Sequence, residues 1–147
     1  MFRSFSREMT TMLDGTFFAT WTPRAQALLR IVTAILFIPH GTAKLLGVPH
    51  VKMFDGLQLF SLMGLAGALE LVGGALILVG LFTRPVAFVM SGFMAVAYFM
   101  AHAPRGNVLV PMLNGGELAV LYCFVFLFLA AAGGGAWSVD GMRGKRG

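Results

Sequence analysis

Four long apolar runs, separated by short segments rich in polar residues, glycine and proline, organise the chain. They occupy about residues 24–46, 59–82, 85–103 and 116–134. An α-helix rises about 1.5 Å per residue, so roughly 20 apolar residues cross about 30 Å of membrane hydrocarbon. The pattern therefore predicts an all-α fold, a four-helix transmembrane bundle in which successive helices alternate in direction.

The residues before the first run follow a different pattern. Apolar side chains recur at helical spacing between Phe2 and Phe17, and Arg3, Arg7 and Asp14 lie mostly elsewhere around the helix. Because charges interrupt the segment, we do not expect a secretory signal. We predict an N-terminal amphipathic helix that lies in the membrane interface, with a disordered tail as the alternative. The predicted organisation is an interfacial segment over 1–23, a membrane domain over 24–141 and a basic cytoplasmic tail over 142–147.

Composition supports an integral membrane protein in the lipid bilayer. Hydrophobic residues make up 58% of the chain and charged residues 12%, whereas soluble domains are about one quarter charged. The net charge of +5 is compatible with a nucleic-acid partner, but the basic residues lie at the ends of apolar runs and in the tails. Basic residues in such places orient a membrane protein, so nucleic acid is not an expected partner.

Lysine and arginine are unevenly shared between the two sides of the predicted bundle. One side has both termini and the turn after the second run, and it carries Arg3, Arg7, Arg24, Arg84, Arg143, Lys145 and Arg146. The other side carries Lys44, Lys52 and Arg105. Since cytoplasmic segments are enriched in these residues, we predict a multi-pass protein of the cell inner (plasma) membrane with both termini in the cytoplasm.

The first apolar run carries a polar stripe. Its members are spaced by three or four residues: Arg30, Thr33, Phe37, His40 and Lys44. A strong charge in mid-span costs roughly 2.5–3.5 kcal/mol, whereas each Leu, Ile, Phe or Val returns only about 0.3–0.6 kcal/mol. The first run therefore depends on other helices to give its polar groups partners. Pro39 removes a backbone hydrogen bond and is predicted to bend this helix just before His40.

Glu70 is the single formal charge of the second run, and small residues surround it. Gly67, Glu70 and Gly74 share one helical face, and Gly64 and Gly73 lie nearby. Glycines at such spacing let another helix backbone approach closely. We therefore predict that Glu70 faces protein rather than lipid.

Two interpretations of the polar residues are open. In the first, Arg30 and Glu70 form a structural ion pair that holds the bundle together. In the second, a polar pocket opens to the outer side, lined by His40, Lys44, Glu70, His102 and Glu117. Such a pocket could bind an anion or a quinone head group, relay protons or hold a metal ion. A metal is the least favoured ligand, because no His-x-x-x-His or Glu-x-x-His spacing places ligands together.

Several motifs together resemble the DoxX family of small four-helix membrane proteins. They are LLRIVTAILFIPHGTAKLLG, GALELVGGALILVGLFTRPVA, GELAVLYCFVFLFLA and GGGAWSVDG, and the resemblance covers about residues 24–141. The family's motif positions are matched by Arg30, His40, Gly41, Lys44, Glu70, Gly73, Gly74, Arg84, Glu117, Ser138 and Asp140. The resemblance implies a membrane partner in sulfur and redox metabolism. One branch of the family resembles subunits of a thiosulfate to quinone oxidoreductase. Another is associated with a membrane oxidoreductase complex that contains superoxide dismutase and a sulfurtransferase, so the resemblance implies a role of this kind.

Three functions are compatible with these patterns. The first is a membrane subunit of a quinone- or sulfur-linked redox complex, with quinone as the candidate cofactor and other membrane or peripheral subunits, or a homo-oligomer, as partners. The second is a non-enzymatic membrane anchor or assembly partner, and the third is a small oligomeric transporter or proton pathway. A thiol–disulfide mechanism is excluded because Cys123 is the single cysteine. The sequence carries no self-contained catalytic motif.

The candidate residues fall into two groups. Those predicted to line the polar pocket are Arg30, His40, Lys44, Glu70, His102 and Glu117. Those predicted to have structural roles are Pro39, Gly41, Gly67, Gly73, Gly74, Arg84 and Asp140. No catalytic residue is assigned and no metal ligand is predicted.

Overall fold

The computed structural model describes residues 15–144, and over that range the chain is helical without strands. The all-α prediction is therefore confirmed. The main helices are α2 (Gly15–Leu46), α3 (Leu62–Val79), α4 (Thr83–Ala97) and α6 (Glu117–Ala132). Shorter elements are η1 (Lys52–Phe54), the π-helical turn η2 (Tyr98–His102), η3 (Ala103–Arg105), α5 (Pro111–Asn114) and α7 (Val139–Arg143).

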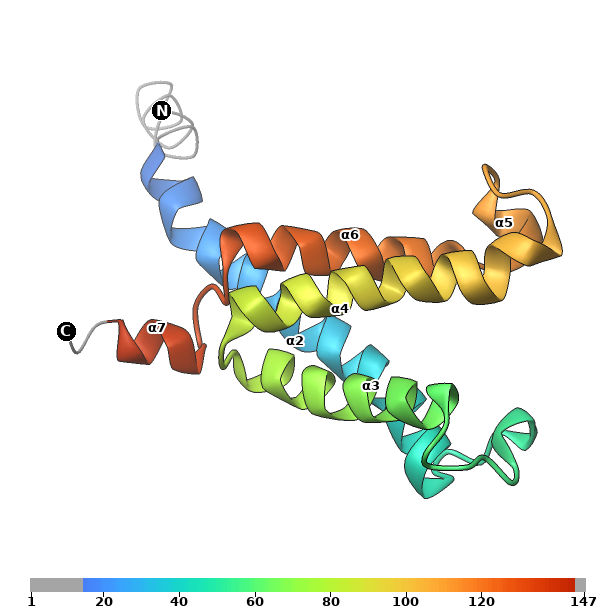
Figure 1. The fold of residues 1–147 in the computed structure, drawn as a ribbon. Helices are drawn as coiled ribbons and strands as arrows, with labels where there is room; N and C mark the ends of the chain where they lie inside the picture. The colour runs from blue at the N-terminus through green and yellow to red at the C-terminus, as the bar shows by residue number, and fades with distance from the viewer. Residues whose placement is uncertain (1–14, 145–147) are drawn as a thin grey trace, which may run out of the picture.

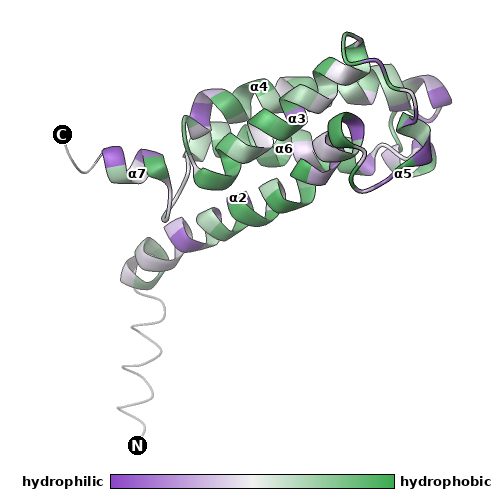
Figure 2. Cartoon of the chain, turned by 90° about the horizontal axis from the view of Figure 1, so that it is seen from below, coloured by the Kyte–Doolittle hydropathy of each residue, from purple (hydrophilic) through white to green (hydrophobic). Residues whose placement is uncertain are grey.

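The long helices form two antiparallel pairs. Figure 1 shows α2 beside α3 and α4 beside α6, and these two pairs make most of the contacts between elements. The pairs are joined by the short α3–α4 turn, at the same end of the molecule as α7. The α2–α3 loop and the α4–α6 loop lie at the opposite end. Polar residues gather toward the two ends, whereas the helices between them are mostly hydrophobic (Figure 2).

Three helical segments are long and apolar enough to cross a membrane: Gly15–Leu46, Leu62–Val79 and Thr83–Arg105. The helix α6 is a shorter apolar helix of 16 residues. The chain is thus an all-helical protein with several segments suited to a lipid bilayer.

Several element boundaries differ from those that the sequence predicts. Residues 1–23 are predicted to form a separate segment, but α2 runs without interruption from Gly15 through Pro23, and residues 1–14 lie outside the described range. Pro39 also lies inside α2, which stays helical on both sides of it. The loop predicted between the third and fourth runs contains one helical turn, α5, because Pro111 is well suited to the first position of a helix.

The helix α3 has clear start and stop signals. The Ser61 hydroxyl accepts a hydrogen bond from the Gly64 N–H at 3.1 Å, which satisfies one of the free donors at the helix start. Gly80 ends the helix with a φ of +70°. A side chain at Gly80 would be strained by this φ, and its Cβ would also lie 2.5 Å from the Ser138 Cβ. Gly80 therefore lets the α3–α4 turn pack against the segment that leads into α7.

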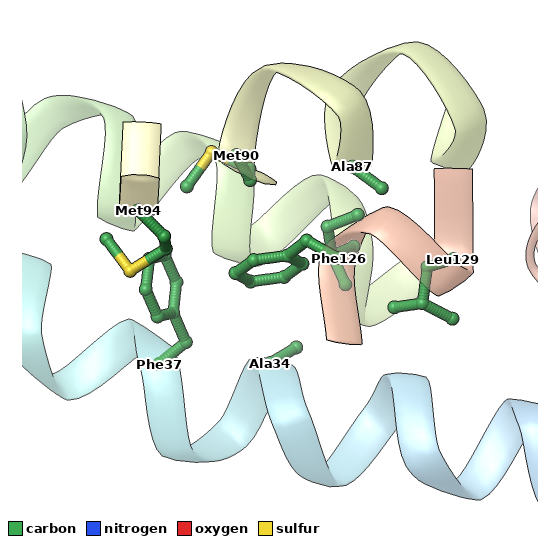
Figure 3. Close-up of a cluster of buried hydrophobic side chains, with 8 residues drawn as sticks. Ala34, Phe37, Ala87, Met90, Met94, Phe126 and Leu129 are labelled. Carbon is green, nitrogen blue, oxygen red and sulfur yellow. The ribbon is translucent and has the colours of Figure 1, made fainter. Parts of the chain in front are cut away.

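A hydrophobic core joins α2 and α3 to α4 and α6. Figure 3 shows Phe37 and Ala34 of α2 pointing toward Phe126 of α6, with Met90 and Met94 of α4 beside them. The Phe37 and Phe126 rings meet edge to face, with centroids 5.1 Å apart, a geometry that aromatic pairs favour. This core holds the two helix pairs together at mid-length.

Glycines bring α2 and α3 into close contact. A Cβ added to Gly41 would lie 2.6 Å from the Leu71 backbone nitrogen and 2.8 Å from the Gly67 carbonyl oxygen. Gly74 likewise faces Ile38 of α2, whereas Gly73 faces Met90 of α4. The glycines near Glu70 therefore set how closely α3 packs on both neighbours, and they fix the register between α2 and α3.

Candidate functional site

Two polar centres lie at opposite ends of the α2–α3 pair. Lys44 and Glu70 form one centre near the α2–α3 loop, and Arg30 forms the other near the α3–α4 turn. The 14 residues from Arg30 to Lys44 correspond to about 21 Å along the helix. The polar stripe thus serves two separate sites rather than one.

The first centre is an ion pair between neighbouring helices. The Lys44 Nζ lies 2.5 Å from Glu70 Oε1 and 2.6 Å from Glu70 Oε2. Both side chains are almost buried, with 10% and 6% of their surface exposed. The Phe54 ring covers the ammonium at 5.5 Å. Because both charges are removed from solvent, each carries a large desolvation cost that the other offsets.

A polar pocket of about 360 Å³ lies under the loop that joins α2 to α3, and Lys44 of the ion pair lines it, whereas Glu70 lies behind Lys44 and is not among the lining residues. Lys44, His50, Phe54 and Asp55 are among the residues that line it. His50 Nε2 lies 2.9 Å from Asp55 Oδ1, so the pocket is lined by a second acid–base pair from the loop. The sequence pattern places His50 and Asp55 in this outer loop but does not assign them to a site. Their five-residue separation matches no helical pairing, since side chains three or four residues apart are the ones that meet on a helix, so the sequence carried no signal for this pair.

The second centre surrounds Arg30, which is completely buried. Its Nε donates to the Gly134 carbonyl at 2.9 Å, and its Nη2 donates to the Trp137 carbonyl at 2.9 Å. Its Nη1 donates to the last-turn carbonyls of α3, at 2.6 Å to Ile77 and also to Leu78. These carbonyls lie at the negative end of the α3 dipole, which favours a cation there.

The interpretation in which Arg30 and Glu70 form an ion pair is therefore wrong. Glu70 binds Lys44, and Arg30 is satisfied by backbone carbonyls, as the two sets of contacts show. The prediction that Glu70 faces protein is confirmed, since 4% of the residue is exposed.

Asp140 and Arg84 form hydrogen bonds between segments at the end of the bundle where Arg30 lies. The two carboxylate oxygens of Asp140 accept from the backbone N–H groups of Phe82 at 2.8 Å and Thr83 at 2.7 Å, which caps the start of α4. The Arg84 guanidinium donates to carbonyls at the end of α6, to Ala130 at 3.4 Å and also to Ala131. Each side chain thus ties one helix end to another segment.

The environment of Asp140 lowers the pKa of its carboxyl group. Burial alone would raise this pKa, but the hydrogen bonds from Thr83 and Phe82 and the positive charge of Arg143 hold it below its ordinary value of 3.8. The folded protein therefore favours the ionised carboxylate.

We expect Asp140→Asn to destabilise the protein by about 1 kcal/mol at neutral pH, because one amide oxygen cannot replace two charged acceptors. The pKa is lower in the folded state, so the stabilisation by Asp140 is complete above 3.8 and is lost as the pH falls through the folded-state pKa. Thermal unfolding in detergent, recorded between pH 7 and about pH 3, checks this. A stability difference that stayed constant down to the lowest pH would contradict the role given to the ionised carboxylate.

His40 does not lie in the pocket that was predicted for it. It is exposed on the surface of the bundle, and its ring centroid lies 6.5 Å from that of Tyr122 on α6. Phe37 lies against both rings, at 6.3 Å from His40 and 5.2 Å from Tyr122. His40 and Tyr122 thus present polar groups on the α2–α6 side of the molecule.

His102 and Glu117 lie at a third place, near the α4–α6 loop. His102 stacks on Tyr98, and its Nδ1 lies 3.4 Å from the Asn114 carbonyl, whereas Glu117 is exposed in the first turn of α6. Asn114 is buried and holds this loop, since its Nδ2 donates to the Tyr98 hydroxyl at 3.1 Å and its Oδ1 accepts from the Gly116 N–H. Of the six residues predicted to line one pocket, the structure brings together Lys44 and Glu70. It places Arg30 at the opposite end of the α2–α3 pair, His40 on the α2–α6 side, and His102 and Glu117 near the α4–α6 loop.

The chemistry open to the Lys44–Glu70 centre is that of a proton donor beside a proton acceptor. An ammonium can donate hydrogen bonds to a carbonyl or an anion, and a carboxylate can accept a proton from a hydroxyl group. Among residues 15–144, no three His, Cys, Asp or Glu side chains gather as metal ligands would.

Comparison with known proteins finds one matching family and three relatives of known sequence. The DoxX family model matches residues 25–103. An uncharacterized protein of Haemophilus influenzae is 46% identical over 123 residues, which cover 82% of this chain and 91% of that protein. "Inner membrane protein YqjF" of Escherichia coli is 34% identical, with 80% of this chain and 90% of that protein covered. "Putative oxidoreductase CatD" of Bacillus subtilis is 29% identical, with 77% and 82% covered.

No solved structure matches the chain. The family match therefore rests on sequence, and it spans α2 to the end of the π-helical turn that follows α4, the region that contains Arg30, Lys44 and Glu70. The matched segment covers more than half of the chain, and two of the relatives exceed 30% identity over most of their length. The chain belongs to the DoxX family of membrane proteins.

Proposed function

We propose that this protein is a four-span inner-membrane subunit of a redox complex, and that the pocket beside Lys44 and Glu70 receives the polar head group of a quinone. The observation that carries the proposal is the buried Lys44–Glu70 pair beside a polar pocket of about 360 Å³. Buried charges within membrane helices are costly, so they mark functional sites more often than structural ones. The pocket also offers His50 and Asp55 from the loop.

The proposed chemistry at this pair is hydrogen bonding and proton transfer. Lys44 would donate to a quinone carbonyl oxygen, and Glu70 would accept a proton from, or return it to, the hydroxyl of the reduced head group. His50, paired with Asp55 at 2.9 Å, would carry protons between this pair and the aqueous side. The quinone would supply the two-electron chemistry, and a partner subunit would exchange the electrons with it.

Two relatives support the proposed setting. The name of the Escherichia coli relative places that protein in the inner membrane, and the Bacillus subtilis relative carries the name "Putative oxidoreductase CatD". The proposed orientation follows the basic residues. Arg24, Arg84 and Arg143 belong to the α7 end, and Lys52 and Arg105 to the loop end, so the α7 end would face the cytoplasm.

The test is binding of a short-chain quinone to the purified full-length protein in lipid nanodiscs, followed by quinone-linked activity in native membranes. We expect Glu70→Gln to weaken binding by about tenfold or more, because it removes the charge that holds Lys44 in place. The matched control is Glu117→Gln, since Glu117 is exposed and forms no ion pair within the described residues. If Glu70→Gln folds normally and binds quinone as tightly as the control does, the proposal fails.

A further inference from the structure

We propose that the α7 end of the bundle binds the head groups of anionic phospholipids through two arginine–aromatic pairs, Arg24 with Trp21 and Arg143 with Phe82. This site is independent of the quinone pocket, which lies at the opposite end of the helices. The proposed ligand chemistry is a lipid phosphate held by a guanidinium group, with the acyl chains beside the exposed aromatic ring.

The geometry of the two pairs is similar. The Arg24 guanidinium carbon lies 5.0 Å from the Trp21 ring centroid, and that of Arg143 lies 5.7 Å from the Phe82 ring centroid. Both rings are about half exposed, at 51% for Trp21 and 56% for Phe82. A guanidinium group is planar and can bind a phosphate through two N–H groups on one edge, and the attraction between the cation and the ring helps to hold the group in place.

The charge balance at this end favours an anionic partner. Within residues 15–144, neither Arg24 nor Arg143 forms an ion pair. The carboxylate of Asp140 attracts Arg143, but both of its oxygens already accept backbone hydrogen bonds at the start of α4. The other two arginines here are engaged, since Arg30 is buried among carbonyls and Arg84 caps α6.

The surrounding surface favours a lipid over an acidic protein. The first turns of α2 extend beyond the bundle at the α7 end (Figure 1), and they expose Phe17, Phe18 and Trp21. Trp137 is also exposed nearby, at 62%. Aromatic rings interleaved with arginines are typical of the layer where head groups meet acyl chains, because the rings insert while the cations remain at phosphate level.

The opposite end provides a natural control. Two exposed cations lie at this end, Lys52 in η1 and Arg105 in η3. In the described part of the chain neither of them stacks on an aromatic ring, and Lys44 is paired with Glu70. Removing Lys52 and Arg105 changes the net charge by the same amount as removing Arg24 and Arg143. A purely nonspecific attraction would therefore respond equally to changes at either end.

The experiment is native mass spectrometry of the full-length protein with phosphatidylglycerol or phosphatidylcholine, with affinities confirmed by titration at about 0.15 M salt. The test variant is Arg24→Gln with Arg143→Gln, and the control is Lys52→Gln with Arg105→Gln. We expect the wild type and the control to prefer phosphatidylglycerol, and the test variant to bind it roughly 30-fold more weakly.

Thermal unfolding must show that both double variants fold as the wild type does. To separate charge loss from misfolding, Arg24→Lys with Arg143→Lys keeps both charges and should retain part of the preference for phosphatidylglycerol. The proposal is overturned if the wild type binds both lipids equally, or if the test and control variants lose affinity to the same extent.

Discussion

Replacing Arg30 with methionine is expected to destabilise the protein by on the order of 3–5 kcal/mol, since each buried acceptor that loses its donor costs about 1–3 kcal/mol. Arg30 is buried and donates to four carbonyl groups from two segments: the end of α3 and the segment that joins α6 to α7. Methionine fills a similar volume but donates no hydrogen bond. All four carbonyl groups would lose the hydrogen bond from Arg30, although Ile77 would keep the Gly80 N–H as a donor, and each group left unsatisfied is costly away from water.

Arg30→Lys should fall between the wild type and Arg30→Met. A lysine keeps the positive charge near the end of the α3 dipole, but its single ammonium group cannot reach four carbonyls in different directions. Lys52→Met, at an exposed position in the outer loop, serves as the control and should change stability little. The measurement is thermal or denaturant unfolding in detergent micelles. Equal stability of Arg30→Met and Lys52→Met would show that the buried guanidinium is not a structural centre.

The second large effect is expected at Lys44 and Glu70. Lys44→Met or Glu70→Leu alone should destabilise the protein by on the order of 3–5 kcal/mol, since each leaves an almost buried charge without its partner. The double variant should be more stable than either single variant, because two apolar side chains of similar size do not require desolvation of a charge. The same unfolding assay on the wild type and the three variants gives the coupling energy of the pair.

The double variant also distinguishes a structural role of the Lys44–Glu70 pair from a functional one. If the pair serves the proposed quinone site, Lys44→Met with Glu70→Leu should fold but bind no quinone. If the pair is only a lock between α2 and α3, the double variant should fold and bind as the wild type does. Simple addition of the two single losses would contradict the close contact of 2.5 Å between Lys44 Nζ and Glu70 Oε1.

These expectations depend on the register between α2 and α3, which decides the partner of each polar residue. Gly41 lies against Leu71, and Ile38 lies against Gly74, so the two helices run antiparallel with little freedom to slide. In this register, Lys44 lies within reach of Glu70, whereas Arg30 meets the end of α3 near Gly80. A shift of one helical turn would bring His40 closer to Glu70 and leave Lys44 without its partner.

Local sequence patterns were sufficient to predict the all-α fold, three of the helical segments suited to a membrane and the burial of Glu70. These features follow from the length of apolar runs, a helical repeat of 3.6 residues and the small side chains beside the carboxylate. The motifs of the DoxX family could also be recognised without a structure. The start of α2 was not, since a proline is typical of a helix start, whereas α2 begins at Gly15 and carries Pro23 in its interior.

Only the tertiary packing decides which polar side chains are in contact. Arg30, His40 and Lys44 share one stripe, so the sequence left each of them a possible partner of Glu70. With Gly41 packed closely on α3, Lys44 contacts Glu70, His40 lies on the α2–α6 side, and Arg30 donates to last-turn carbonyls of α3. The physical reason is that a helical repeat fixes the direction of a side chain, whereas its partner depends on how far one helix slides along another, which side-chain packing sets.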